Sequence, residues 1–506
     1  MEIVREKIEE ILAIDPAADA VEFQGAWITW GQISRIKHEL ERYLAALGPS
    51  GRVAVLMRNR PEILCSTLAC IGQSQCLVTI NPVYPEDRVA EDLRDAQAPV
   101  VIASTPDWER NSVAEAMLAS GALCLEVRLD ADTPVIVRQE ARASFSAFPR
   151  AFAENVAVEM LTSGTTGKPK RVPLKTADYQ QSLLGAAAFE RGRSNDDAPR
   201  LRSGVTILSN SFAHTSGLSS SLNVVLGGRK SCLLEKFRVE DFVDALTRHR
   251  PRVAGAPPAA LRMLMDAKPP LDTFSSLVAM RTGTAPLDPD LADAFYETYG
   301  VPVLQNYGAT EFGGVAGWTM SDFKEHRTDK RGSVGRLNPE LEGRAVNPDT
   351  NLPLEPGEPG ILQLKGAKIG DGVSWVTTTD FAKVDADRFV FILGRADNAI
   401  IRGGFKIHPD DVKKAIETHP DVVEAAVVGM PDPRLGKVPV AACVLRPGSS
   451  VSADDILLFA RGQLAAYQVP VQLKLLDDLP RTNLLKISQV DLLALLSNEK
   501  QQGGVT

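Results

Sequence analysis

The sequence predicts an α/β protein: a large N-terminal domain of doubly wound mixed sheets with a small β subdomain, followed by a small α+β C-terminal domain. Three observations lead to this fold class. A chain of 506 residues is longer than one hydrophobic core usually serves. In the first part, short β-rich runs alternate with helical runs, which is typical of parallel sheets. Residues 330–395 are rich in glycine, proline and short β segments, and residues 396–506 have a strand and helix pattern of their own.

The chain opens with an amphipathic helix, because Val4, Ile8, Ile11 and Leu12 recur on one helical face. The alternation that follows predicts strands over 52–57, 77–80 and 100–103, and helices over 61–72 and 89–97. Residues 105–150 are less regular, and no element is assigned there.

The middle of the chain predicts a polar segment at the end of a strand. A helix is expected from Asp288, a good N-cap, to Gly300, a favourable C-terminal stop. The strand over 301–305 then leads directly into residues 306–311. Ligands of parallel sheets bind beyond the carboxyl ends of the strands, so this position indicates a site.

The remaining pattern completes the domain organisation. Further strands are expected over 204–208, 360–365, 425–428 and 440–445, and further helices over 409–418 and 453–466. A boundary within residues 394–397 divides the chain into domains 1–395 and 396–506.

Composition and charge exclude several classes of function. The chain is 44% hydrophobic and 24% charged, as in ordinary globular proteins. Its net charge of −8 argues against nucleic-acid or membrane-surface binding, although a local basic loop can still hold an anionic substrate. The six cysteines show no CxxC pair or zinc spacing, so buried reduced thiols are expected. Because there is no apolar run of membrane-span length and no signal peptide, a cytoplasmic protein is predicted.

Residues 163–170, Ser-Gly-Thr-Thr-Gly-Lys-Pro-Lys, form a loop suited to phosphate. Backbone N–H groups on a flexible turn, hydroxyl donors and ammonium groups are what a polyphosphate needs. The loop is not a Walker P-loop, because only two residues separate Gly164 from Gly167 and Pro169 follows Lys168. Taken alone, it is also compatible with a solvated turn between two buried strands.

Five further segments follow this loop in a defined order. They are Asn-Tyr-Gly-Ala-Thr-Glu at 306–311, Trp-Val-Thr-Thr-Thr-Asp at 375–380, Gly-Arg-Ala-Asp-Asn-Ala-Ile at 394–400, Arg-Gly-Gly-Phe-Lys-Ile-His-Pro at 402–409 and Pro-Arg-Thr-Asn-Leu-Leu-Lys-Ile at 480–487. Together with residues 161–170, they resemble the motifs of the adenylate-forming superfamily, which includes acyl- and aryl-CoA ligases, luciferases and peptide-synthetase adenylation domains. The resemblance covers about residues 20 to 490.

The resemblance implies an ATP and AMP site. The loop would hold the β- and γ-phosphates, Tyr307 would stack on adenine, Asp380 and Arg395 would bind the ribose, and Glu311 would bind Mg²⁺. The residues assigned to the nucleotide are Thr162, Ser163, Gly164, Thr165, Thr166, Gly167, Lys168, Gly283, Thr284, Ala285, Asn306, Tyr307, Gly308, Thr310, Asp380 and Arg395. Taken alone, Glu311 is also compatible with a surface carboxylate.

The resemblance assigns catalysis to Lys486, supported by Thr310, Glu311 and His214. Lys486 would reach the α-phosphate and the carboxylate oxygens as negative charge builds up. The small domain would then rotate about Asp397 and present a CoA-binding loop, which is assigned to Gly403, Gly404, Phe405 and Lys406.

The acyl pocket is assigned to His214, Ser219, Asn223, Gly313 and Val315, with Gly283, Asn306 and Gly308 as further candidates. Taken alone, His214 is equally compatible with a structural role. The residues are mostly small, and none is a basic partner for a second carboxylate. They favour an aromatic or medium-chain monocarboxylic acid.

The chain departs from the family at four positions. Arg171, Thr379 and Leu485 stand where glycine is common, and Arg402 stands where lysine is common. None of these changes removes a group that the reaction needs. Leu485 is expected to restrict the backbone beside Lys486.

The function implied by the resemblance is ATP-dependent carboxylate–CoA ligation, through an acyl-adenylate and then a thioester. Two alternatives stay open: a stand-alone adenylating enzyme that loads a carrier protein, and a non-catalytic nucleotide-binding protein on the same fold. The expected partners are a carboxylic acid, ATP and CoA as co-substrate. The chain is expected to bind no nucleic acid, to have no membrane span, and to be a monomer or homodimer.

Overall fold

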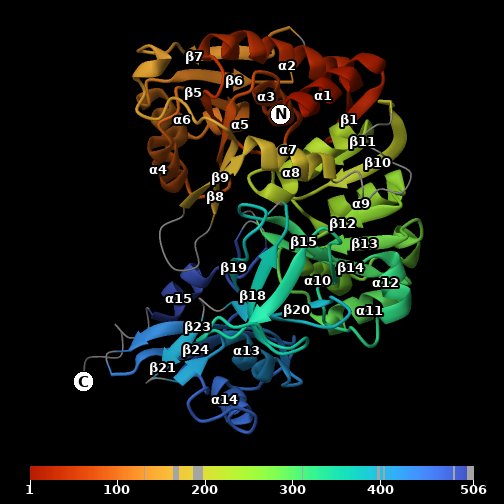
Figure 1. The fold of residues 1–506 in the computed structure, drawn as a ribbon, viewed down its shortest axis with the longest axis vertical. Helices are drawn as coiled ribbons and strands as arrows, with labels where there is room; N and C mark the ends of the chain where they lie inside the picture. Colours follow the sequence, from red (N-terminus) through yellow and green to blue (C-terminus); the bar gives the residue numbers. More distant parts are fainter. Residues whose placement is uncertain are drawn as a thin grey trace.

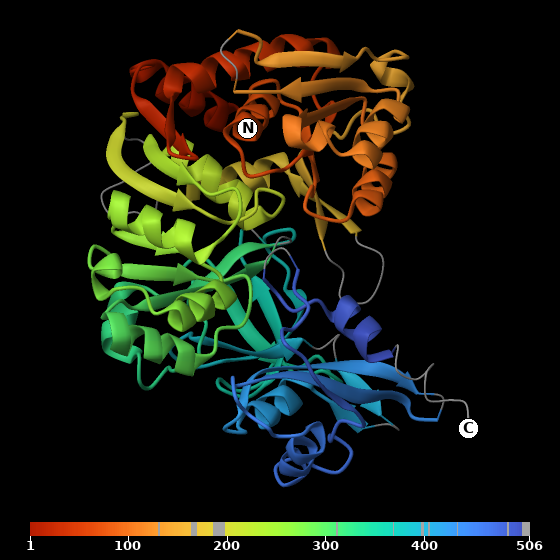
Figure 2. The ribbon, with the colours of Figure 1, turned by 180° about the vertical axis from the view of Figure 1, so that it is seen from behind.

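The computed structural model describes residues 1–497 except 130–131, 163–169, 186–197, 310–311, 368, 396–398, 403–404, 433 and 483–484. The fold is the predicted α/β fold, with several sheets and a separate C-terminal region. Figures 1 and 2 agree that the N-terminal sheet and the C-terminal strands lie at opposite ends of the long axis.

The first sheet runs in the order β7-β6-β5-β3-β4-β8-β9, and its central strands are parallel, as predicted. These strands are β3 (Arg52–Leu56), β4 (Cys76–Ile80), β5 (Val100–Ser104), β6 (Leu123–Val127), β7 (Val135–Gln139), β8 (Val156–Thr162) and β9 (Lys170–Lys175). Its helices are α3 (Pro61–Gly72), α4 (Glu86–Ala96), α5 (Thr105–Trp108) and α6 (Asn111–Ala119), with a 3₁₀ turn at Phe145–Ala147. The elements within 105–150 were not predicted, because short runs between prolines carry little periodicity.

The second sheet has the order β10-β11-β1-β2. It joins strands from near the N-terminus to strands that follow almost two hundred residues later in the chain. Its strands are β1 (Asp19–Phe23), β2 (Ala26–Thr29), β10 (Arg202–Leu208) and β11 (Arg229–Leu233). Its helices are α1 (Glu2–Ile14), α2 (Trp30–Leu44), α7 (Thr176–Gly185) and α8 (Thr215–Leu226), with a 3₁₀ turn at Ala45–Leu47. The predicted amphipathic helix is confirmed, since Val4, Ile8, Ile11 and Leu12 are the buried residues of α1.

The third sheet, β12-β13-β14-β15-β16, carries the polar segment predicted at a strand end. Its strands are β12 (Val253–Gly255), β13 (Ala279–Thr282), β14 (Val303–Ala309), β15 (Gly313–Gly317) and β16 (Arg336–Leu337). The flanking helices are α9 (Val239–His249), α10 (Pro258–Ala267), α11 (Pro289–Tyr299) and α12 (Met320–His326), with a 3₁₀ turn at Leu271–Phe274. The prediction for α11 is confirmed: the Asp288 carboxylate accepts from the backbone N–H of Asp290, and Gly300 ends the helix in the left-handed region.

The β subdomain pairs β17 (Glu342–Val346), β18 (Gly360–Lys365), β19 (Val376–Val384) and β20 (Val390–Arg395) in sequence order. The C-terminal sheet contains β21 (Ile400–Arg402), β22 (Phe405–Ile407), β23 (Val422–Asp432), β24 (Gly436–Leu445) and β25 (Leu473–Leu475). Its helices are α13 (Pro409–Glu417), α14 (Ala453–Arg461) and α15 (Gln489–Ser497). The helix predicted over 453–466 ends early, because its C-cap is Gly462.

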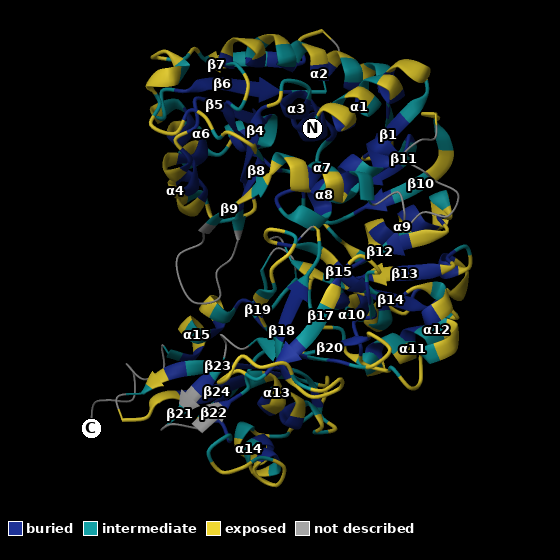
Figure 3. Cartoon of the chain, viewed as in Figure 1, coloured by how far each residue is buried: buried dark blue, intermediate teal, exposed yellow. Residues whose placement is uncertain are grey.

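Apolar side chains fill separate cores, and the sheet strands are largely buried (Figure 3). Two clusters consist of residues from position 400 onward, such as Ile407 and Val412 in one and Val440 and Leu492 in the other. All six cysteines are buried and free, as predicted. Among the described helices, none combines the length and the apolar character that a bilayer span requires.

Candidate functional site

Three residues predicted to bind the nucleotide lie on three different strands and come together at one edge of a cleft. The Tyr307 hydroxyl, from β14, donates a hydrogen bond to the Asp380 carboxylate on β19. Asp380 is the cross-strand partner of Arg395 at the end of β20, and its backbone N–H donates to Thr378 Oγ1 at 3.1 Å. An aromatic ring, a carboxylate and a guanidinium group are therefore neighbours at this edge of the cleft.

Two glycines beside this group lie where a side chain would crowd neighbouring atoms. A Cβ on Gly283 would lie 2.7 Å from Asn306 Oδ1 and 3.0 Å from the Asn306 carbonyl oxygen. A Cβ on Gly308 would overlap the Gly313 carbonyl. A β-carbon at either position would crowd neighbouring protein atoms, so glycine lets these segments pack closely. Tyr307 offers an aromatic ring to this part of the cleft, and Asp380 offers two carboxylate oxygens as hydrogen-bond acceptors.

Three basic side chains, Lys486, Arg395 and His214, lie near one another where the C-terminal region borders the cleft. The Lys486 ammonium has its pKa lowered from 10.5, first by burial and then by the charge of Arg395. Burial and the nearby Lys486 charge lower the pKa of His214 to about 4, so its imidazole is neutral near pH 7. No carboxylate among the described residues forms an ion pair with Lys486. A group of basic side chains without a carboxylate partner for Lys486 is a site for an anion.

Of the predicted site residues whose side chains the structure describes, all except Val315 line one cleft. Its volume of about 3190 Å³ exceeds what one small ligand needs, so the cleft can receive more than one substrate. The lining includes His214, Ser219, Asn223, Gly283, Thr284, Ala285, Asn306, Tyr307, Gly308, Gly313, Asp380, Arg395 and Lys486. Val315 is not among its described lining residues: it is fully buried in the core of the β subdomain with Val334 and Leu362.

Several predicted residues lie outside the described part of the chain and stay predictions. They are Ser163, Gly164, Thr165, Thr166, Gly167, Lys168, Thr310, Glu311, Asp397, Gly403 and Gly404. For Thr162, Phe405 and Lys406 the backbone is described but not the side chain. The strands that flank the glycine–threonine loop do pair, with Thr162 opposite Lys170.

Sequence reasoning missed Tyr179 and Ser182 of α7, which line the same cleft. The Tyr179 hydroxyl lies 3.4 Å from Ser219 Oγ, and a Cβ on Gly313 would lie 3.9 Å from Ser182 Oγ. These contacts place α7 and α8 at the end of the cleft where the acyl pocket was assigned. No motif marks α7, because its cleft-facing side depends on elements distant in sequence.

Two of the departures from the family have structural partners. Arg171 forms an ion pair with Asp92 and donates to the Thr79 carbonyl at 3.1 Å. Arg402 donates to the Tyr467 carbonyl at 2.8 Å. Both arginines therefore hold neighbouring elements together.

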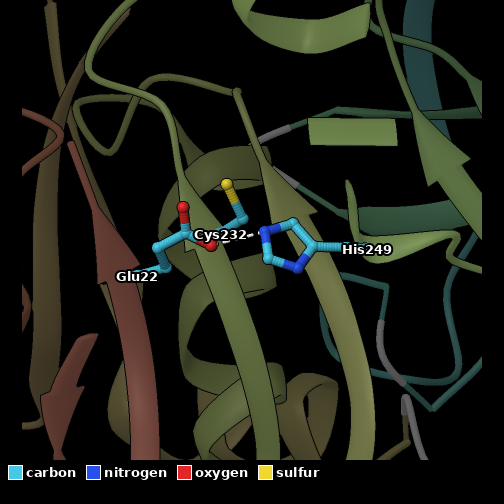
Figure 4. Close-up of side chains that lie close together, drawn as sticks. All are labelled: Glu22, Cys232 and His249. Carbon is cyan, nitrogen blue, oxygen red and sulfur yellow. Dashed lines mark ion pairs between the residues drawn. The ribbon is translucent and has the colours of Figure 1, made fainter. Parts of the chain in front are cut away.

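A second group of ligand-type side chains connects β1, β11 and α9 (Figure 4). His249 Nε2 lies 2.5 Å from Glu22 Oε2, and Arg248 Nη1 donates to Glu22 Oε1 at 2.6 Å. Burial raises the pKa of the Cys232 thiol to about 11, so the thiol keeps its proton. Because Arg248 already balances the charge of Glu22, we interpret the group as an ion-pair network that ties α9 to the sheet.

Comparisons with known proteins cover nearly the whole chain. Residues 8–373 match the family model described as AMP-binding enzyme, and residues 411–486 match the AMP-binding enzyme C-terminal domain. The chain is similar to the 2-succinylbenzoate–CoA ligase of Bacillus velezensis, with 28% identity over 92% of this chain and 93% of that protein. It is also similar to a feruloyl-CoA synthase of an Amycolatopsis species, with 28% identity over 94% of this chain and 95% of that protein.

Solved structures share the fold. ATP-bound MatB from Rhodopseudomonas palustris aligns with a TM-score of 0.78 at 24% identity, covering 98% of this chain and 99% of that chain. O-succinylbenzoate CoA synthetase from Bacillus subtilis in complex with AMP aligns with a TM-score of 0.74 at 24% identity, covering 96% and 97%.

Proposed function

Because the chain belongs to the AMP-binding enzyme family and is an acid–thiol ligase of the AMP-forming class, we propose that it joins a monocarboxylic acid to CoA in two steps. In the first step, a carboxylate oxygen attacks the α-phosphorus of ATP, and the bond to pyrophosphate breaks. In the second step, the CoA thiol attacks the acyl carbonyl, loses its proton, and AMP leaves. Activation is needed because a free carboxylate has no good leaving group.

One observation carries the proposal: Lys486 lies near His214 and Arg395, and this group lies beside the Tyr307–Asp380 pair. Negative charge on the α-phosphate and the attacking carboxylate would be offset by the Lys486 ammonium. The neutral His214 ring would lie against the acyl group without adding a second charge. Asp380 would accept hydrogen bonds from the ribose hydroxyls.

Several parts of the reaction rest on the family resemblance. The loop at 163–168 would hold the leaving pyrophosphate, and Glu311 would bind Mg²⁺, whose charge lowers the cost of the pyrophosphate's departure. We further propose that the domain boundary lies at 395/396. The small domain would turn about Asp397 to bring Gly403, Gly404, Phe405 and Lys406 to the CoA thiol arm.

The acid is proposed to be aromatic or of medium chain length. The end of the cleft is formed by small side chains, among them Ser182, Ser219 and Asn223, and by the bare backbone of Gly313. None of these four is a cation for a second carboxylate. Two relatives are named for acids that contain aromatic rings, 2-succinylbenzoate and ferulate, which supports the aromatic option.

The test is a pyrophosphate-release screen over aryl, short-chain, fatty and dicarboxylic acids, each with ATP and Mg²⁺, with and without CoA. We expect acid-dependent pyrophosphate release with an aromatic or medium-chain acid, and a thioester only when CoA is present. The Asp380→Ala variant serves as a control and should lose most of the activity through weaker nucleotide binding.

Two outcomes would overturn the proposal. Pyrophosphate release with a thioester only on a carrier protein would identify a carrier-loading enzyme. Binding of ATP without pyrophosphate release for any acid would identify a non-catalytic nucleotide-binding protein.

A further inference from the structure

Leu485, the residue before Lys486, has a backbone conformation that normally favours glycine. Its φ is +56°, in the left-handed region where a β-carbon crowds the backbone. The turn is closed by two backbone hydrogen bonds, from Thr482 N–H to the Lys486 carbonyl at 2.6 Å and from Leu485 N–H to the Thr482 carbonyl at 2.9 Å. Glycine, which has no β-carbon, adopts this region at the lowest cost. Leucine at this position therefore carries a local conformational cost.

The Leu485 side chain packs against a hydrophobic core of the large domain. This cluster is formed around Phe242, Leu261 and Met280, from α9, α10 and β13. All its other described members come from residues 205–303, whereas the apolar side chains around Leu485 in sequence, such as Leu479 and Ile487, pack in the core of the C-terminal domain. Leu485 thus connects the two domains at the residue next to Lys486.

The same turn is tied to the C-terminal domain on its other side. Arg481 forms an ion pair with Glu424 of β23, and its Nη1 donates to the Leu485 carbonyl at 3.2 Å. Leu485 is therefore linked to the small domain through Arg481, and its side chain contacts the large domain. A change in the position of the small domain would therefore move Lys486 directly.

We propose that Leu485 is a positioning residue that holds the C-terminal domain in the orientation in which Lys486 reaches the nucleotide site. The inference rests on the proposed two-step function. When the domain turns away for the CoA step, the Leu485 side chain has to leave the apolar cluster. The contact therefore favours adenylate formation over thioester formation.

The test compares Leu485→Ala, Leu485→Gly and Leu485→Met in the full chain. The first half-reaction is measured as acid-dependent ATP–pyrophosphate exchange without CoA. The second is measured as thioester formation from a chemically prepared acyl-adenylate and CoA. Leu485→Ala should slow the first on the order of tenfold, the effect of losing one partly buried leucine contact, and should leave the second unchanged or faster.

The other variants separate contact from backbone strain. Leu485→Met keeps an apolar side chain of similar size and should stay close to the parent protein. Leu485→Gly relieves the strain at φ +56° but loses the contact, so it should slow the first half-reaction as alanine does without lowering the melting temperature further. Leu458→Ala, on α14 and 65% exposed, is the matched control and should change neither half-reaction.

A second readout does not depend on activity. Cysteines introduced at Glu297 on α11 and Asp454 on α14, both exposed, carry a donor and an acceptor dye. Without any substrate, Leu485→Ala should broaden the distance distribution between the dyes and shift it away from that of the parent. An unchanged distribution together with an unchanged first half-reaction would overturn the inference, as would equal losses in both half-reactions. If the parent releases no pyrophosphate with any acid, the proposed function fails, and the dye distances still decide whether Leu485 holds the domains together.

Discussion

At the scale of single residues, Lys486 is the group on which the proposed first step depends most. Among the described residues, no carboxylate forms an ion pair with it. We expect Lys486→Ala to abolish adenylate formation and to spare thioester formation from a preformed acyl-adenylate, because only the first step builds up charge at the α-phosphate. The measurement is the pair of separate half-reactions described above. Equal loss in both would show that the lysine is needed for the fold or for both steps.

The pH dependence of the first half-reaction follows from the same pKa shifts. Burial lowers the pKa of Lys486, so the ammonium loses its charge as the pH rises through a value below that of a free lysine. We expect ATP–pyrophosphate exchange to fall on the alkaline side at a pH below about 10.5, the ordinary lysine pKa. His214, with a pKa of about 4, is already neutral near pH 6 and should contribute no limb there.

Lys486→Arg is the control for this profile, because arginine stays charged throughout the range. If the variant is active and keeps the alkaline limb, another group titrates.

Several residues could be assigned from sequence because a motif marks them. Tyr307, Asp380 and Arg395 were predicted in separate motifs and lie together in the structure. Val315 was predicted to line the acyl pocket, but its side chain is fully buried in the subdomain core. Tyr179 had no motif at all.

At the scale of elements, the β14–β15 hairpin depends on the close approach of two backbones. Gly308→Ala would place a methyl group on the Gly313 carbonyl, so the strands must separate. We expect a loss of about 1–3 kcal/mol in the free energy of unfolding, together with most of the ATP–pyrophosphate exchange. Gly314→Ala is the matched control, because a Cβ there meets no atom within 4 Å. Similar stability of the two variants in denaturant unfolding would contradict this account.

The first sheet contains a buried ion pair whose rupture should be costly. Arg52 on β3 is 1% exposed and binds Glu159 on β8 through two hydrogen bonds of 2.9 and 2.6 Å, reaching across β4. Arg52→Leu leaves Glu159 buried without this partner, and we expect the free energy of unfolding to fall by about 3–5 kcal/mol.

Arg150 provides the control for this pair. It contacts the same Glu159 oxygen at 3.4 Å, and its side chain is 45% exposed. Arg150→Ala should cost less than about 1 kcal/mol in chemical denaturation. A comparable loss for both variants would mean that burial does not set the strength of the pair.

At the scale of the whole molecule, the proposed function requires the small domain to change its orientation between the two steps. The described cysteines are all buried, so cysteines introduced at Glu297 and Asp454 can be labelled selectively. With ATP and a substrate acid, the dye distance should match the arrangement in which Lys486 lies beside His214. Addition of CoA should move it to a second value. A single distance under all conditions would contradict domain rotation.

The sequence by itself determined the fold class and the order of the elements, and it identified the chemical groups of the proposed nucleotide site. These follow from local signals: hydrophobic periodicity, caps such as Asp288, and motifs whose residues stand next to each other in the chain. Only the tertiary structure decided which groups meet across the cleft: Lys486 with His214, α7 with α8, and Leu485 against a core formed by residues 205–303. Such contacts join residues far apart in sequence, and they depend on how whole domains pack rather than on any local pattern.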